Sequence, residues 1–199
     1  MSLSPSDRIL QLADKQLFVR ARDVERMGVA REYLLRLCAK GKLVRTGWGV
    51  YQRPGVKASR RHAFAEVAKR VPSATICLES ALVFHKLTTR QPEAITIAMP
   101  AATRKPNLDT VSLRVHRFSG AAFTVGREKH LIEGIPVHVY NPAKTVVDCF
   151  KFRNKIGLDV ALNALRTSLR RERATLRQIK HYAKICRVLR VMRPYLDAL

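Results

Sequence analysis

The chain has 199 residues, with 38 Lys or Arg against 15 Asp or Glu, which gives a formal net charge of +23. An apolar content of 47% excludes a disordered tail, and no apolar run approaches the roughly 18 residues of a membrane-spanning helix. So basic a chain is expected to bind a polyanion, with an affinity that falls as salt rises. A GC-rich genome is the alternative explanation for the Arg excess, but it does not explain the shortage of acids.

The N-terminus has no signal-peptide pattern, because Asp7, Arg8 and Asp14 interrupt its apolar residues. We therefore expect a soluble cytoplasmic protein. The four cysteines are at least 37 residues apart, and the histidines show no metal-ligand spacing. The sequence therefore predicts four free thiols, no metal and no cofactor.

The first 57 residues are typical of a winged helix-turn-helix. A helix over residues 6–16, capped by Ser4 or Ser6, precedes a short strand at Phe18-Val19. Two helices follow, at about 21–27 and 31–40, and they end at Gly28 and Gly41. Their expected buried seam is Val24, Met27, Val29, Leu34, Leu37 and Cys38.

Residues 43–46 and 50–53 are expected to be the two strands of the wing, joined by a turn at 47–49. Trp48 has two interpretations of equal weight, contact with a DNA sugar or closure of the small core. Tyr51 is expected in the core. Pro54-Gly55 then closes the domain.

The second helix of the pair is the candidate recognition helix, which enters a major groove by its N-terminal half. Arg60 and Arg61, on a helix expected over residues 58–71, either extend the phosphate-binding surface or belong to a solvated face. The predicted DNA-binding residues are Arg22, Ala30, Arg31, Glu32, Tyr33, Arg36, Lys40, Arg45, Trp48, Arg53, Arg60 and Arg61.

Residues 58–199 are predicted to form a second, mixed α/β domain with a small antiparallel sheet. A helix over 75–87, capped by Ser73 or Thr75, precedes strands at 94–99 and 111–118 and a hairpin around Gly134. Asn141-Pro142 is a typical helix start. The fold class is therefore α+β.

The C-terminus is predicted to be helical from 158 to 192, with a capping box formed by Thr175 and Gln178. Apolar stripes run through Leu158, Ala161, Leu162, Leu165 and Leu169, and through Leu176, Ile179, Tyr182, Ala183 and Cys186. The basic residues are expected largely outside these stripes. Arg170, Arg171, Arg173 and Arg177 form either a functional basic surface or a solvated helix face.

Nothing in the sequence is typical of an enzyme, and we expect no catalytic residue. A restriction-type nuclease needs an acid on one strand and Glu-x-Lys on the next to hold magnesium, and no credible strand carries that motif. Nucleophile-elbow and phosphate-loop motifs are also missing. Lys144 and Asp148, one helical turn apart, are interpreted as a surface or structural ion pair.

The chain resembles the AbiEi-type antitoxins of type IV toxin–antitoxin systems, which act in abortive infection as phage defence. The resemblance covers almost the whole length. It is carried by Val29 to Leu37, Gly41 to Tyr51, Glu79 to Leu82 with His85 to Leu87, and Pro142 to Asp148. The family often has His-Gly-Leu where this chain has His85-Lys86-Leu87.

The resemblance implies two activities. Residues 1–57 would bind double-stranded promoter DNA at inverted repeats and repress the protein's own operon. Residues 58–199 would counter a nucleotidyltransferase-like toxin, without needing a stable complex. We expect a monomer in solution that pairs on DNA. The alternatives are a DNA-binding transcriptional regulator without antitoxin activity and a DNA-processing enzyme with a winged-helix targeting domain.

Overall fold

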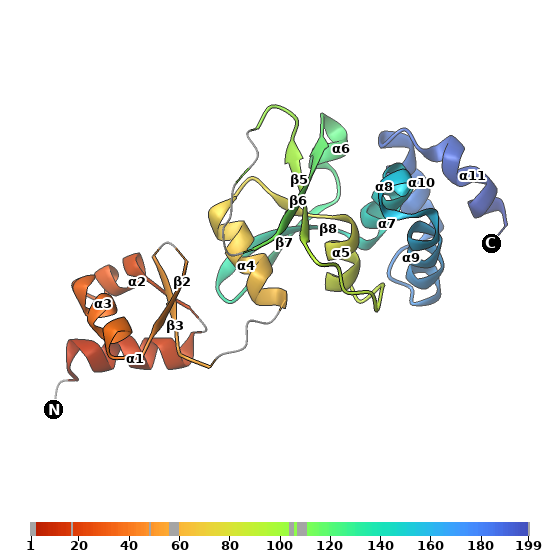
Figure 1. Ribbon diagram of the computed structural model, residues 1–199. Coiled ribbons are helices and arrows are strands. Elements are labelled where there is room, and N and C mark those ends of the chain that lie inside the picture. The colour runs from red at the N-terminus through yellow and green to blue at the C-terminus, as the bar shows by residue number, and fades with distance from the viewer. Residues whose placement is uncertain are drawn as a thin grey trace. The chain divides into compact units, whose positions relative to one another are not determined.

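The computed structural model describes residues 3–16, 18–47, 49–55, 60–103, 106 and 111–198. The chain divides into two compact units, Met1–Ser59 and Arg60–Leu199, which we call unit 1 and unit 2 (Figure 1). Together they have a mixed α+β architecture, in agreement with the predicted fold class.

Unit 1 begins with α1, whose cap Ser4 accepts a hydrogen bond from the Asp7 amide at 3.2 Å. Its sheet is antiparallel with the order β1-β3-β2. The elements are α1 (Pro5–Lys15), β1 (Val19–Arg20), α2 (Ala21–Arg26), α3 (Glu32–Ala39), β2 (Val44–Gly47) and β3 (Val50–Gln52).

The ends of α2 and α3 are built alike. After each helix a glycine has a positive φ, +72° at Gly28 and +66° at Gly41. The amides of each glycine and of the next residue donate to carbonyls in the last helical turn. Glycine adopts this conformation without steric penalty, which confirms both predicted helix ends.

The core of unit 1 lies between the helix pair, α1 and the sheet. It contains Ile9, Val24, Leu34, Leu37, Leu43 and Tyr51. The apolar spacing of the helix pair predicted Val24, Leu34 and Leu37, and Tyr51 was also expected in the core. Met27 and Cys38 are partly buried beside it. The Arg8 guanidinium donates to the Met27 carbonyl at 2.8 Å and so fastens α1 to the turn between α2 and α3.

Unit 2 contains a five-stranded sheet with helices on both faces. Its elements are α4 (Arg60–Arg70), β4 (Thr75–Ile76), α5 (Leu78–Phe84), β5 (Ile95–Pro100), β6 (Leu113–Phe118), α6 (Ala121–Thr124), β7 (Arg127–Ile132), β8 (Ile135–Tyr140), α7 (Pro142–Lys151), α8 (Arg153–Ile156), α9 (Leu158–Arg170), α10 (Leu176–Ile185) and α11 (Leu189–Asp197).

The sheet is mixed, with the order β6-β5-β4-β8-β7, so the prediction of an antiparallel sheet is wrong. β5 runs parallel to β6 and β4 parallel to β8, while the other two pairs are antiparallel. The parallel pair of β5 and β6 joins two predicted strands, whose alternation does not show their relative direction. The parallel pair of β4 and β8 was missed at Thr75 and Ile76, which were expected to begin a helix. They form a strand between β5 and β8, and α5 starts only at Leu78 after the cap residue Cys77.

Helices cover the two faces of the sheet unequally (Figure 1). On one face α4 buries Phe64, Val67 and Val71 against Ile97 and Val139. The other face is covered by a larger cluster to which α5, α7, α9, α10 and α11 all contribute.

The most enclosed element is α7. The Asn141 side chain accepts a hydrogen bond from the Lys144 amide at 2.8 Å and Pro142 occupies the first turn, as predicted. Eight consecutive residues, 143–150, are buried, because α5, α9 and α10 pack around this helix.

Within α7, Lys144 and Asp148 form an ion pair whose side chains are both 0% exposed, so it is not a surface pair. The ammonium donates to both carboxylate oxygens at 2.6 Å, and it lies 4.1 Å from the centre of the Tyr140 ring. Burial raises the pKa of Asp148 to about 6, and the hydrogen bonds and charge of Lys144 offset this only in part. The carboxylate therefore depends on Lys144 to stay charged in the core.

The C-terminal helices follow the predicted pattern with two exceptions. Thr175 and Gln178 form the capping box of α10. Ala161 and Leu165 are buried, but Leu158 and Leu176 are 37% and 40% exposed, because each is the first residue of its helix. All four cysteines are free thiols, as expected.

The end of α5 has the same hydrogen bonds as the ends of α2 and α3, but Lys86 occupies the position of the glycine. Its φ is +59°, and the Lys86 and Leu87 amides donate to carbonyls of the last turn. A lysine in this conformation is strained by roughly 1–2 kcal/mol. The glycine frequent in the resembling family fits the turn without strain, and the turn itself is formed here with lysine.

Lys86→Gly is expected to raise the free energy of unfolding by about 0.5–1 kcal/mol, because relief of strain exceeds the added chain entropy of glycine. Urea unfolding measures the change. Lys180→Gly, at an exposed position within α10, is the control and should lose about 1 kcal/mol. Equal destabilisation by both variants would contradict the assignment of strain to Lys86.

Lys144→Met is expected to destabilise unit 2 by about 3–5 kcal/mol, because it leaves the Asp148 carboxylate buried without a partner. The double variant Lys144→Met/Asp148→Leu removes both charges and should recover most of that loss. Denaturant unfolding of the two variants and wild type measures this coupling. A double variant as unstable as the single one would show that packing, and not charge, dominates at this position.

Candidate nucleic-acid interface

The solvent side of unit 1 includes one face of α3 and the turn before it. Leu34 and Leu37 are 0% and 2% exposed, whereas Arg31, Glu32 and Arg36 are exposed. Ala30 and Lys40, at either end of this segment, are also exposed, and Tyr33 is half-buried. Most residues predicted to contact DNA from this helix are thus open to solvent.

Arg31, directly before α3, is held by Glu25 of α2. One guanidinium nitrogen donates to a Glu25 carboxylate oxygen at 3.1 Å, and Nε contacts the other oxygen. The hydrogen bond to Glu25 raises the pKa of Arg31. The side chains are 66% and 45% exposed, so water screens the pair and Arg31 can exchange Glu25 for another acceptor.

Arg36 is also held locally. Its guanidinium lies 2.9 Å from the Glu32 carboxylate one turn earlier and 5.2 Å from the centre of the Tyr33 ring. Both charged side chains are about 60% exposed. The two arginines of this face are therefore each held by a weak, exposed contact with a glutamate.

The residues predicted to contact DNA from the wing differ from one another. Arg45 on β2 is exposed. Trp48 lies outside the described residues, so neither of its two interpretations is tested. Arg53 after β3 donates two hydrogen bonds of 2.7 Å to Asp14 and lowers the pKa of that carboxyl. This two-point contact joins the end of β3 to α1, so Arg53 has a structural role in addition to the predicted one.

The remaining predicted DNA contacts lie in both units. Arg22 on α2 is exposed. The side chain of Arg60 is outside the described residues. Arg61, on α4 of unit 2, lies 5.9 Å from the centre of the Phe84 ring of the same unit.

One exposed residue of α3 was not among the predicted contacts. Leu35 is 57% exposed, although it is a large apolar side chain in the middle of the helix. The sequence already indicates this exposure, because Leu35 falls outside the apolar seam and lies four residues after Arg31, on the same side of the helix.

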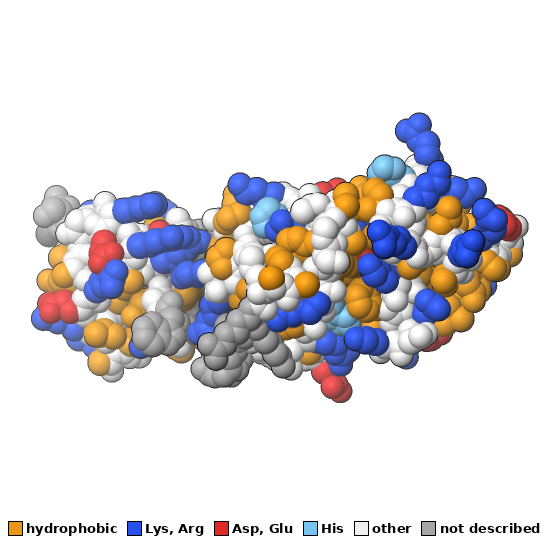
Figure 2. All heavy atoms as spheres, turned by 90° about the horizontal axis from the view of Figure 1, so that it is seen from above, with side chains coloured by type: hydrophobic (Ala, Val, Ile, Leu, Met, Phe, Trp, Pro, Cys, Tyr) orange, Lys and Arg blue, Asp and Glu red, His pale blue; other side chains and the backbone are white. Residues whose placement is uncertain are grey.

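Lys and Arg side chains are spread over the visible face of both units, with few acids between them (Figure 2). Of the predicted basic surface in unit 2, Arg170, Arg173 and Arg177 are exposed. Arg171 is exposed as well, but its guanidinium donates to the Lys86 carbonyl at the end of α5. Arg171 therefore joins α9 to α5.

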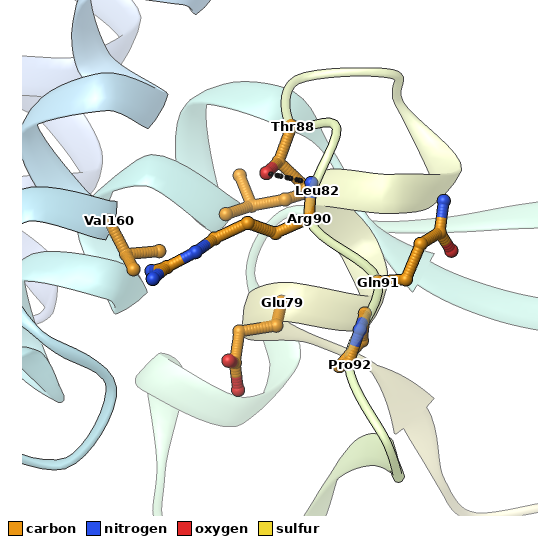
Figure 3. Close-up of a pocket in the computed structure, with 7 residues that line it drawn as sticks. All are labelled: Glu79, Leu82, Thr88, Arg90, Gln91, Pro92 and Val160. Atoms are coloured by element: carbon orange, nitrogen blue, oxygen red, sulfur yellow. Dashed lines mark hydrogen bonds between the residues drawn. The ribbon is translucent and has the colours of Figure 1, made fainter.

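Unit 2 also contains a small cavity of about 190 Å³ between α5, the segment after it and α9 (Figure 3). Arg90 extends toward Val160 of α9 and lies 3.3 Å from Asp159. Glu79 on the opposite wall lies 3.3 Å from Arg114. The residues that line this cavity include no nucleophile beside a general base, so its geometry does not suggest catalysis.

In the described ranges, no three His, Cys, Asp or Glu side chains lie close enough to share a metal ion. No helix in the same part of the chain is long and apolar enough to cross a membrane.

Comparison with known proteins shows similarity to one family and to solved structures. The family described as "Transcriptional regulator, AbiEi antitoxin" matches residues 7–54. Comparison with curated proteins gives no match. The crystal structure of the RV2827C protein from Mycobacterium tuberculosis is similar, with 17% identity and a TM-score of 0.62, over 92% of this chain and 72% of that chain. That similarity concerns the fold alone, whereas the match of residues 7–54 shows that most of unit 1 is similar to the AbiEi antitoxin family of transcriptional regulators.

Proposed function

We propose that this protein is the antitoxin of a type IV toxin–antitoxin system and represses its own operon. The match of residues 7–54 to the AbiEi antitoxin regulators carries this proposal. The exposed basic face of α3, beside a β hairpin, supports DNA binding by unit 1 as a winged helix-turn-helix.

In this mechanism the N-terminal half of α3 enters the major groove. Arg31 contacts a base edge, where its two parallel donors match guanine O6 and N7. Arg36 contacts phosphate, and Arg45 follows the backbone from the wing. Two copies bind an inverted repeat about one helical turn apart, although the free protein is a monomer.

Binding requires the arginines to exchange partners. In the free protein Glu25 and Glu32 hold Arg31 and Arg36 in exposed ion pairs. A guanine or phosphate competes for the same guanidinium groups, and the nearby acids repel the DNA. The two glutamates thus lower the affinity for any DNA. Binding is then favourable only where a guanine or phosphate replaces Glu25 and Glu32 as the partner of the arginines.

We propose that unit 2 supplies the antitoxin activity without acting as an enzyme. Several of its acids are engaged in ion pairs, including Glu79 with Arg114 and Asp148 with Lys144. Arg170, Arg173 and Arg177 form an exposed basic surface that suits either the nucleotidyltransferase-like toxin or the nucleic acid on which it acts.

A transcriptional regulator without antitoxin activity is the second candidate function. The observation that favours it is the extent of the family match, which ends at residue 54 and leaves unit 2 unassigned. Growth of cells that express the adjacent toxin gene distinguishes the two functions.

Arg31→Ala is expected to weaken binding to the preferred duplex by about 5- to 150-fold, the discrimination that one bidentate arginine provides, and to flatten sequence preference. Gel shift with preferred and scrambled duplexes measures both effects. Lys15→Ala, an exposed cation on α1, is the control and should retain the preference. Unchanged binding by Arg31→Ala would exclude α3 from the groove.

Glu25→Gln is expected to tighten DNA binding by up to about fivefold, the factor that an exposed ion pair contributes, because it frees Arg31. Asp159→Asn in unit 2 is the matched control, since it also removes one exposed negative charge beside an arginine. Fluorescence anisotropy at fixed salt compares the two. An equal gain in both variants would mean that only net charge changed.

In cells that express the toxin, the intact chain is expected to restore growth. The triple variant Arg170→Ala/Arg173→Ala/Arg177→Ala should fail, because it removes the basic surface and keeps Arg171 at the Lys86 carbonyl. Lys129→Ala/Arg190→Ala/Arg193→Ala loses the same charge elsewhere on unit 2 and should still restore growth. Equal growth with both variants would leave the surface without an antitoxin role.

A further inference from the structure

A row of three residues follows the solvent side of α3 at four-residue intervals. Arg31, Leu35 and Ala39 lie one turn apart, and all three are exposed. The row therefore presents a cation, then a branched apolar side chain, then a methyl group.

The charged residues beside this row are already held in place. Arg31 contacts Glu25, and Arg36 contacts Glu32 and the Tyr33 ring. The middle of α3 thus offers Leu35, which is 57% exposed, as its apolar contact. A single exposed leucine is common on protein surfaces, so its meaning depends on its position.

That position indicates DNA as the partner. Arg31, Arg36 and Lys40 outnumber the two acids on this face, Glu25 and Glu32, and this excess of positive charge favours a polyanion over an apolar protein surface. In the major groove the thymine C5-methyl is the apolar group that a leucine can contact. We propose that Leu35 selects thymine by contact with this methyl group, an inference that rests on the proposed entry of α3 into the groove.

The helix geometry fixes where the thymine lies. One turn of α-helix advances about 5.4 Å, and one base pair advances about 3.4 Å along DNA. Leu35 therefore reaches a base about one to two pairs from the base that Arg31 contacts.

The test uses the intact chain and a duplex library with a randomised central segment. Wild type should select a motif with thymine one or two pairs from the guanine whose selection is lost in Arg31→Ala. Replacing that thymine by deoxyuracil removes only the methyl group. Wild type should then bind about three- to fourfold more weakly, the effect of one buried methyl group.

Leu35→Ala should discriminate little between the thymine and uracil duplexes, so the two changes are not additive. Val44→Ala, at another exposed apolar residue of unit 1, is the control and should retain the wild-type discrimination. Thermal unfolding verifies that Leu35→Ala is folded. Equal binding of both duplexes by wild type, or full discrimination by Leu35→Ala, would overturn the role of Leu35 alone. Failure to select any motif would overturn DNA reading by α3 as well.

Discussion

The structure of unit 2 depends on the ion pair between Lys144 and Asp148. The two opposite charges lie in the core of unit 2 on α7, the helix around which α5, α9 and α10 pack. Each charge would be costly in the core without the other, and the hydrogen bonds at 2.6 Å hold them together in one geometry. The thiol of Cys186 also donates to the Asp148 carboxylate, at 3.9 Å, so the pair links α7 to the end of α10. Both charges lie on α7 and move with it, so the contacts that a shift of α7 would break are those of Asp148 with Cys186 and of Lys144 with the Tyr140 ring.

The scarcity of acids gives the other ion pairs their significance. The chain has 15 acidic residues against 38 Lys or Arg, so most cations have no acid of their own. An acid beside an arginine therefore determines which other groups that arginine can contact. Asp14 holds Arg53 by two short hydrogen bonds and fixes the sheet of unit 1 to α1. Glu25 and Glu32 hold Arg31 and Arg36 where both partners are largely exposed, and these contacts are easily exchanged. The first pair stabilises structure, whereas the other two are exposed contacts that DNA would have to replace in the proposed function.

Local chemistry made much of this fold predictable. The glycines after α2 and α3, the Asn141 cap and the Thr175–Gln178 box each determine a helix end through nearby atoms. The strand at Thr75 and Ile76 was missed because two residues are too short to show alternation, and its partners Ala98 and Val139 are distant in sequence. The same limit applies to the site. The exposure of Arg31 was predicted from its helix position, but its contact with Glu25 and the burial of Lys144 with Asp148 follow from tertiary packing. The exposure of Leu35 follows from its position outside the apolar seam.

In the proposed function, α3 of the intact chain reads bases from the major groove. Methylation interference tests it most directly, because methylation of guanine N7 alters only the major-groove edge that Arg31 is proposed to contact. Duplexes selected by the protein would be partly methylated, bound, separated from free DNA and cleaved at the modified guanines. We expect one guanine in each half of an inverted repeat to be depleted from the bound fraction, about one helical turn apart. Uniform recovery of all methylated guanines, with binding intact, would contradict the account.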